Sequence, residues 1–263
     1  MIRVLNKQNY NLLRELVISD FKIRYQGSVL GYFWSLLKPL ALFTILYIVF
    51  AKFFRFGETV PFFAAYLLLG IVLWTFFTEA TNTALKIIVE RGDLIRKVTI
   101  PKYILVFSAT FSALINMILN LLVVGIFLVL SGAPIMLTLL LLPLVVAELY
   151  AFTLAVSFLL AALYVKFRDI LYIWEVGLQG LFYATPIIYP LSIVPEQFQS
   201  LLLYNPIAQI IQDARYLSVT PETTTAWQVL GPKALIPLGV VVAAGFISSW
   251  YFKRQSRYFA EDL

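Results

Sequence analysis

The sequence predicts an all-α, polytopic membrane protein. We expect six transmembrane helices, an N-terminal amphipathic helix at the membrane interface and a short extracytoplasmic re-entrant helical hairpin before the last span. The chain of 263 residues is 61% hydrophobic and only 13% charged, whereas a soluble domain is about 25% charged. Its mean hydropathy is +0.89, and apolar runs of about 20 residues, the length of a membrane-spanning helix, recur along it. A water-soluble enzyme is therefore excluded.

Cysteine and histidine are absent from the sequence. Disulfides, Cys/His zinc sites, thiol nucleophiles and Ser-His-Asp triads are thereby excluded. We accordingly expect no catalytic residue and no metal site in this chain.

Six apolar runs are long enough to cross a bilayer. The third ends at a turn sequence, Ser131-Gly132-Ala133-Pro134, and the fifth contains Pro186 near its end. The mixed polar N-terminus does not resemble a removable signal peptide. The predicted spans are residues 36–54, 62–85, 103–130, 137–165, 170–189 and 234–252.

Lys and Arg predict the orientation of these spans. Sixteen of the 20 basic residues lie before or at the start of the first span, after the last, or between spans two and three or four and five. Cytoplasmic loops carry such an excess, so both termini are expected in the cytoplasm and the chain is a multi-pass protein of the cytoplasmic membrane. The net charge of +6 then reflects topology, and nucleic-acid binding is not expected because the basic residues form no single face.

The segment from Asn11 to Gln26 contains no Gly or Pro and predicts an amphipathic helix that leads into the first span, with residues 11–30 as its full extent. Asp20 and Arg24 fall within its apolar arc, four residues apart with the acid first, so they can pair. The pattern fits a passive membrane anchor as well as a docking helix.

Residues 190–220 lie on the outer side and are interrupted by prolines. Asn205-Pro206 predicts a helix start with Asn as the N-cap, and Pro195-Glu196 predicts a second short helix toward Leu203. Helices this short cannot span, so the segment is interpreted as a re-entrant or surface hairpin. An ordinary extracellular loop is the alternative.

The cytoplasmic loop 90–101 contains a short predicted helix. Gly92 ends the preceding helix, Asp93 can cap a new one, and Pro101 excludes Ile100 from helical geometry. One interpretation is a docking surface for a cytoplasmic protein, and the other is a solvated positive loop. The residues presented would be Leu94, Ile95, Arg96, Lys97 and Val98.

Acidic and aromatic residues occur inside the predicted spans. Glu79, Glu148 and Glu175 each need a compensating interaction in lipid. Most aromatic residues fit a boundary belt or lipid-facing packing, but span five combines aromatics with Gln179, Gly177 and Gly180. Aromatic rings with polar tips suit sugar surfaces. The candidate residues for a substrate conduit are Tyr32 and Trp34 at its inner entrance and Tyr172, Trp174, Phe182 and Tyr183 along span five.

Several short motifs occur in an order and at a spacing similar to those of one transporter family. They are Leu13-Arg14-Glu15-Leu16, Asp20-Phe21-Lys22-Ile23-Arg24-Tyr25, Ser28-Val29-Leu30-Gly31 with Trp34 and Lys38-Pro39, Thr99-Ile100-Pro101, Phe167-Arg168-Asp169-Ile170, Thr185-Pro186-Ile187-Ile188-Tyr189 and Tyr204-Asn205-Pro206. Through them the chain resembles the permease subunit of ABC-2 type exporters for polysaccharides, O-antigens and teichoic acids.

The resemblance implies that residues 1–263 form a single ABC-2 transmembrane domain. It implies that two copies of this chain assemble with two copies of an ABC ATPase. The N-terminal helix, including Arg14 and Glu15, and the loop with Asp93 to Val98 would then contact the ATPase. The outer hairpin would form a gate with Pro195, Asn205, Pro206 and Ile210.

The sequence contains no G-x-x-x-x-G-K-[ST] motif, so ATP and Mg²⁺ are expected on a partner chain and no cofactor on this one. We interpret the chain as a permease that exports a lipid-linked polysaccharide, with membrane lipids around it. The alternatives are an ABC-2 permease for a drug or small lipid, and an ion-coupled secondary transporter, although no internal repeat supports the latter. A membrane glycosyltransferase is a weaker alternative because no sizeable soluble domain is present.

Overall fold

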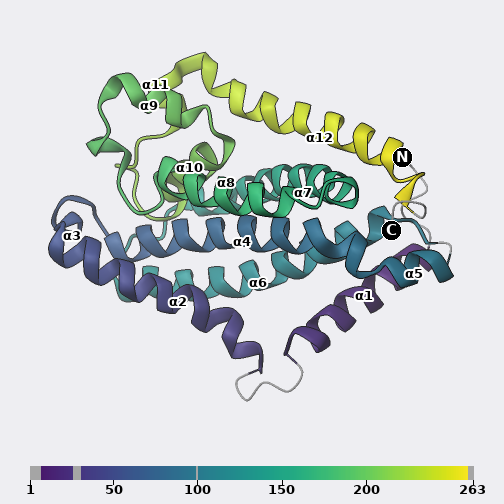
Figure 1. Cartoon of the computed structure of the whole chain (residues 1–263). Coiled ribbons are helices and arrows are strands. Elements are labelled where there is room, and N and C mark those ends of the chain that lie inside the picture. Colours follow the sequence, from purple (N-terminus) through teal and green to yellow (C-terminus); the bar gives the residue numbers. More distant parts are fainter. Residues whose placement is uncertain (1–6, 26–30, 99, 260–263) are drawn as a thin grey trace.

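The computed structural model describes residues 7–25, 31–98 and 100–259, and this part of the chain is mainly helical, without a strand. Figure 1 shows long helices lying roughly side by side, with shorter helices at both ends. The elements are α1 (Lys7–Tyr25), η1 (Gly31–Phe33), α2 (Trp34–Tyr47), η2 (Ile48–Phe53), α3 (Phe56–Thr59), α4 (Phe63–Glu90), α5 (Gly92–Lys97), α6 (Tyr103–Leu130), η3 (Leu137–Leu141), α7 (Leu142–Lys166), α8 (Ile170–Ala184), η4 (Leu191–Ile193), α9 (Glu196–Leu203), α10 (Pro206–Ser218), α11 (Ala226–Leu230), η5 (Gly231–Ala234) and α12 (Leu235–Gln255).

Five helical segments in the described part of the chain have the length and apolar composition of a membrane span. They correspond to five of the six predicted runs, and the third has the predicted bounds. The segments are Trp34–Phe53, Phe63–Glu90, Tyr103–Leu130, Leu137–Lys166 and Ala226–Gln255.

The prediction of six spanning helices is not confirmed, because the run 170–189 forms the shorter helix α8. Its 15 residues extend over about 22 Å, less than the roughly 30 Å of a hydrocarbon core. The helix ends at Ala184 because Pro186 disfavours helical angles at Thr185, which is extended (φ −105°, ψ 135°).

Helix α4 is the central element of the protein. Most of its 28 residues are buried, and α2, α6, α7, α8 and α10 all contact it. By contrast, little of the first span is buried. A helix that is apolar on all sides and surrounded by protein is the expected centre of such a bundle.

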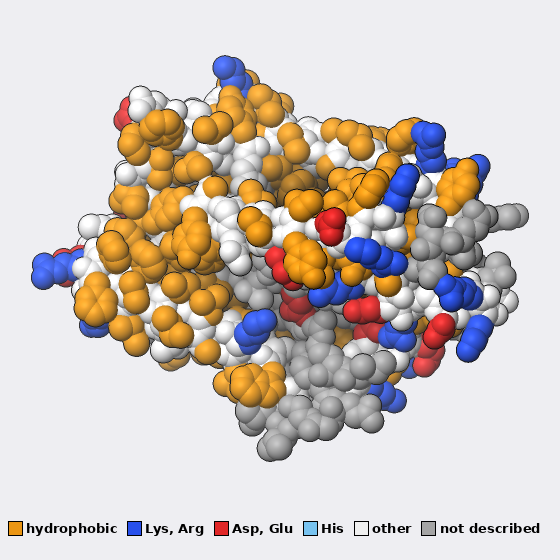
Figure 2. All heavy atoms as spheres, in the orientation of Figure 1, with side chains coloured by type: hydrophobic (Ala, Val, Ile, Leu, Met, Phe, Trp, Pro, Cys, Tyr) orange, Lys and Arg blue, Asp and Glu red, His pale blue; other side chains and the backbone are white. Residues whose placement is uncertain are grey.

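Two ends of the bundle can be distinguished in Figure 1. We call them the α5 end, where α1 and α5 lie and α12 finishes, and the α9 end, where α3, α9 and α11 lie. Figure 2 shows that Lys, Arg, Asp and Glu side chains gather toward the α5 end of this face, while hydrophobic side chains cover most of the rest.

The short helices of the α9 end form where the sequence predicts them. The Asn205 side chain accepts a hydrogen bond from the Ile207 N–H (3.1 Å), and Pro206 occupies the first turn of α10. Helix α9 runs from Glu196 to Leu203, directly after Pro195. Between the first two spans, Arg55 and Phe62 have left-handed backbone angles (φ 56° and 54°), which bend the chain sharply around α3.

Helix α1 contains the first 15 residues of the predicted 11–30 helix, and residues 26–30 lie outside the described residues. Its Leu16 and Val17 are buried, and Leu16 packs into a cluster with residues of α4, α5, α6 and α7. On its polar face, Asn11, Glu15 and Lys22 are exposed. The α1 helix is therefore attached to the α5 end of the bundle by its apolar face.

Candidate functional site

The predicted conduit residues of α8 lie on two different faces of that helix. Trp174 and Phe182 pack against α4: the Trp174 Nε1–H donates to Thr81 Oγ1 (3.2 Å), and the Phe182 ring lies 5.8 Å from that of Trp74. Leu178 is buried on the same face. Trp174 and Phe182 thus position α8 on the bundle rather than lining open space.

The opposite face of α8 is uncovered within this chain. The side chains of Tyr172 and Tyr183 are 66% and 68% exposed, and Gln179 between them is exposed as well. A Cβ added at Gly180 would meet no atom within 4 Å. The result is an exposed strip that carries two phenols, an amide and a stretch of bare backbone.

Helix α2 lies on α4 as well, and its apolar surface is largely uncovered. Phe43 attaches it to the core cluster around α4, whereas Trp34 at its start is half exposed. The side chain of Tyr32 lies outside the described residues. The uncovered faces of α2 and α8 therefore belong to helices that pack on the same central helix.

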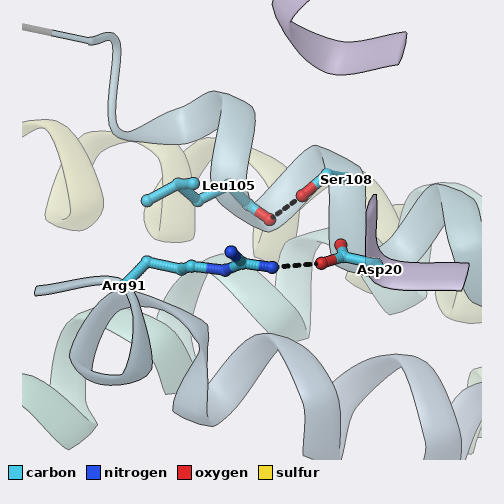
Figure 3. Close-up of polar contacts among 4 residues, drawn as sticks. All are labelled: Asp20, Arg91, Leu105 and Ser108. Carbon is cyan, nitrogen blue, oxygen red and sulfur yellow. Dashed lines mark hydrogen bonds and ion pairs between the residues drawn. The ribbon is translucent and has the colours of Figure 1, made fainter. Parts of the chain in front are cut away.

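An ion pair joins α1 to the junction between α4 and α5. The Arg91 guanidinium Nη2 lies 2.6 Å from the Asp20 carboxylate Oδ1. Figure 3 shows this pair beside α6, where the Ser108 hydroxyl donates to the Leu105 carbonyl (2.9 Å). The sequence suggested Arg24 as the partner of Asp20, but the structure places Arg91 there, and the Arg24 side chain lies outside the described residues.

Helix α5 differs in two respects from the predicted docking helix. Ile95 is buried in the cluster beneath it instead of facing outward, and Asp93 lies in the first turn while Arg91 occupies the N-cap position. Leu94 is partly buried. The predicted coupling residues that remain exposed are Arg14, Glu15, Asp93, Arg96, Lys97 and Val98.

The predicted gate residues also include both buried and exposed side chains. Pro195 is exposed at the start of α9, and Asn205 and Pro206 begin α10, where Asn205 Nδ2 also donates to Thr185 Oγ1 (3.2 Å). Ile210 is completely buried. Asn205 and Ile210 thus hold the hairpin to the bundle, and Pro195 lies on its outer surface.

Arg215 on α10 is completely buried, and its sequence position alone did not single it out. Its guanidinium donates to the carbonyls of Tyr66 (3.1 Å), Pro186 (2.6 Å) and Ile187 (2.6 Å). It therefore joins α4, α10 and the segment after α8. Arg215 follows the apolar residue Ile211 by four positions, so the two share one face of the helix. This spacing was the sequence signal that Arg215 is buried.

The three glutamates of the predicted spans have different surroundings. The Glu79 carboxylate accepts a hydrogen bond from the Asn116 Nδ2 of α6 (3.0 Å). Glu175 is exposed on α8. Glu148 lines a cavity that Asp213 of α10 also lines. Among the residues that the structure describes, no three acidic side chains group together as metal ligands.

Asp213 lies outside the five candidate span helices. Burial raises the pKa of its carboxyl above the ordinary value, and hydrogen bonds from the Gln209 side chain and the Ala226 backbone oppose this in part. Burial acts in this direction because removing a carboxylate from water costs free energy.

Comparison with known proteins is consistent with this architecture. Residues 11–217 match the ABC-2 type transporter family. The chain is 30% identical to an O-antigen export system permease protein, RfbA, of Myxococcus xanthus, with the whole of both chains covered. It is 29% identical to a protein of the same name from Klebsiella pneumoniae, over 79% of this chain and 80% of the other. The chain therefore belongs to the ABC-2 type transporter family.

Proposed function

We propose that this chain is the permease subunit of an ATP-driven exporter, and that it moves a lipid-linked cell-surface polysaccharide across the cytoplasmic membrane. O-antigen, capsule and teichoic acid are the polymers of this class. The similarity over the whole length to a relative named as an O-antigen export permease carries the proposal. An ABC-2 permease for a drug or small lipid is not favoured, since the similar proteins named above are O-antigen permeases.

The conduit would form between two copies of the chain, along the uncovered faces of α2 and α8. Trp34, Tyr172 and Tyr183 would face the polymer. Gly180, which has no side chain, lies between the two tyrosines in the sequence. Rings with polar tips contact sugar faces and hydroxyls, and they carry no fixed charge that would hold a long polymer by multivalent attraction. Trp174 and Phe182 would support α8 from behind.

ATP hydrolysis would take place on a partner ATPase, two copies per transporter, since the sequence has no phosphate-binding loop motif. The exposed residues of α1 and α5 would form the contact surface. The Asp20–Arg91 ion pair supports this proposal because it connects the two helices. A movement of one would then be passed to the other.

In this arrangement the α5 end faces the cytoplasm, in agreement with the excess of Lys and Arg at the ends of the spans that lie there. Residues 170–189 would supply the sixth crossing. Helix α8 runs antiparallel to α4, since Trp174 contacts Thr81 and Arg215 links Ile187 to Tyr66. The non-helical segment 185–189 would continue the path, shielded by protein as non-helical backbone requires. The α9–α10 hairpin would then be re-entrant and form an outer gate.

The test of the function is export itself. In a strain that makes a lipid-linked polysaccharide with its own ABC exporter, the permease gene is replaced by this chain together with its cognate ATPase, and surface and intracellular polymer are measured. Wild-type chain should place polymer on the surface. A variant ATPase without its phosphate-binding Lys should leave the polymer inside. Surface polymer that does not depend on this chain would contradict the proposal.

The coupling surface can be tested in the same cells. Arg96→Glu and Val98→Asp alter exposed side chains of the α5 region, so the fold should be retained while ATPase binding weakens. Export should fall several-fold at unchanged membrane abundance. Lys253→Glu, an exposed charge change at the end of α12, is the matched control and should export normally. Equal export by all three variants would show that α5 is only a solvated connection.

A further inference from the structure

A cavity of about 560 Å³ opens beside α7 near the α9 end. It lies among the first turns of α7, the helices α10 and α11, and the start of α12. None of the residues proposed above for conduit, coupling or gate lines it. Its outer wall is apolar and includes the exposed side chains of Leu144, Leu235 and Leu238, which would face the bilayer.

The polar part of the cavity consists of Glu148, Gln209 and Asp213. Glu148 lines the cavity from α7, and Gln209 and Asp213 line it from α10. The Gln209 side chain is only 8% exposed, and its Nε2 donates to Asp213 Oδ2 (2.6 Å). This bond determines the orientation of the amide, because the reversed amide would direct its oxygen at a carboxylate.

Two buried oxygen atoms of this group have no hydrogen-bond partner among the described residues: Gln209 Oε1 and Glu148 Oε1. Both are acceptors, and an unsatisfied buried polar atom costs about 1–3 kcal/mol. A ligand that satisfies them must donate hydrogen bonds. The two neighbouring carboxyl groups additionally favour a positive charge. A primary ammonium group meets these requirements, with three donors and no acceptor.

The position of the cavity indicates where this ammonium group comes from. In the proposed orientation, Lys166 lies at the cytoplasmic end of α7. Glu148 precedes it by 18 residues, which corresponds to about 27 Å along the helix, so Glu148 lies close to the outer boundary of the membrane. Trp227, an exposed amphipathic ring that also lines the cavity, is typical of the interface. The site therefore lies at the depth of lipid headgroups, with an apolar wall open toward the acyl chains.

We propose that this cavity binds an aminophospholipid of the phosphatidylethanolamine type. Its ammonium group contacts Glu148, Gln209 and Asp213, and its acyl chains lie along Leu144, Leu235 and Leu238. The bound lipid fastens α10 and α11 to α7 and α12, the two helices that carry the cavity's membrane-facing wall. This binding does not depend on which polymer the transporter carries.

The test uses the purified full-length chain, stripped of lipid in detergent. Phosphatidylethanolamine, phosphatidylcholine or phosphatidylglycerol with identical acyl chains is added, and bound lipid is measured by native mass spectrometry together with the thermal midpoint. Phosphatidylcholine shares the phosphate and the chains, but its quaternary ammonium has no N–H donor. We expect phosphatidylethanolamine to bind about tenfold more tightly than the other two, because charge-assisted hydrogen bonds are lost with them.

Variants connect this preference to the cavity. Glu148→Gln and Asp213→Asn keep the size of the side chains and remove charge, so each should abolish most of the tenfold preference. Leu238→Trp fills the apolar wall and should lower binding of all three lipids, which keeps the test decisive if a charge variant fails to fold. Glu222→Gln, an exposed acid outside this cavity, is the control and should bind as the wild type does.

Three results would overturn the proposal. They are equal binding of phosphatidylethanolamine and phosphatidylcholine, unchanged preference in both charge variants, and stabilisation of the lipid-free chain by sodium ions to the same extent as by lipid. The last result would make the cavity a cation site instead.

Discussion

Asp20 and Arg91 are 71 residues apart in the sequence, yet their side chains form an ion pair of 2.6 Å between Oδ1 and Nη2. Asp20 lies on α1, and Arg91 is the N-cap residue of α5. Both side chains are only partly exposed, 18% for Asp20 and 27% for Arg91, so water screens the pair less than it screens a fully exposed one. The pair therefore links the N-terminal helix to the first loop between spans.

Removing either partner of this pair should weaken the attachment of α1. Asp20→Asn and Arg91→Gln are each expected to lower the free energy of unfolding by about 1–2 kcal/mol, more than an exposed pair contributes. The double variant should cost much less than the sum of the two, as measured by a double-mutant cycle in mixed micelles. Glu15→Gln, on an exposed position of the same helix, is the control. Additive effects would show that the pair contributes no coupling.

The buried guanidinium of Arg215 should be essential for stability. Arg215→Lys loses the hydrogen bonds to the Pro186 and Ile187 carbonyls and should cost about 3–5 kcal/mol. Gly70→Ala should cost about 1–3 kcal/mol, because its Cβ would lie 2.6 Å from Arg215 Nη2. The thermal midpoint of the purified chain measures both effects.

Gly125→Ala is the matched control for Gly70→Ala. A Cβ at Gly125, in α6, would meet no atom within 4 Å. The Gly125→Ala variant should therefore be as stable as the natural chain or more stable by up to about 1 kcal/mol. If Gly70→Ala and Gly125→Ala had the same thermal midpoint, the close approach of Arg215 to α4 would be unimportant.

The exposed tyrosines of α8 should matter for transport rather than for stability. Tyr172→Leu combined with Tyr183→Leu should reduce polymer export several-fold at an unchanged thermal midpoint, because bulk is kept while the ring and hydroxyl are lost. Phe246→Leu, on an exposed position of α12, should export normally. Wild-type export by the tyrosine double variant would place the conduit elsewhere.

Trp174→Leu should show the opposite behaviour. It loses the hydrogen bond to Thr81 and the ring contact with Phe77, so the free energy of unfolding should fall by about 1–2 kcal/mol. The measurement is the thermal midpoint, with export normalised to the amount of folded protein. A stable Trp174→Leu variant with impaired export would instead assign this ring to the conduit.

The membrane topology can be measured by cysteine labelling, since the natural chain has no cysteine. The structure exposes Lys97 and Lys166 at the α5 end and Glu222 near the α9 end. An impermeant thiol reagent added to intact cells should label Glu222→Cys, but should label Lys97→Cys and Lys166→Cys only after the cells are opened. Labelling of Lys97→Cys in intact cells would reverse the orientation.

Several elements of this protein could be predicted from the sequence because local interactions decide them. The span Tyr103–Leu130 has the predicted bounds, and Gly132, with its left-handed φ of 71°, lies in the turn that follows it. Asn205 and Pro206 begin α10 as expected. The length of an apolar run can be counted along the chain. A side-chain cap and the permitted angles of Gly and Pro depend only on a few neighbouring residues.

The tertiary structure decided the features that depend on distant residues. Both α8 and α5 carry apolar residues on more than one side, so the sequence could not show that Trp174 and Ile95 face the bundle while Tyr172 remains exposed. The partner of Asp20 lies at the start of α5, and the carbonyls around Arg215 lie on α4 and in the segment after α8. The physical reason is that hydrophobicity determines which segments leave water, whereas packing of those segments against one another determines which face each side chain presents.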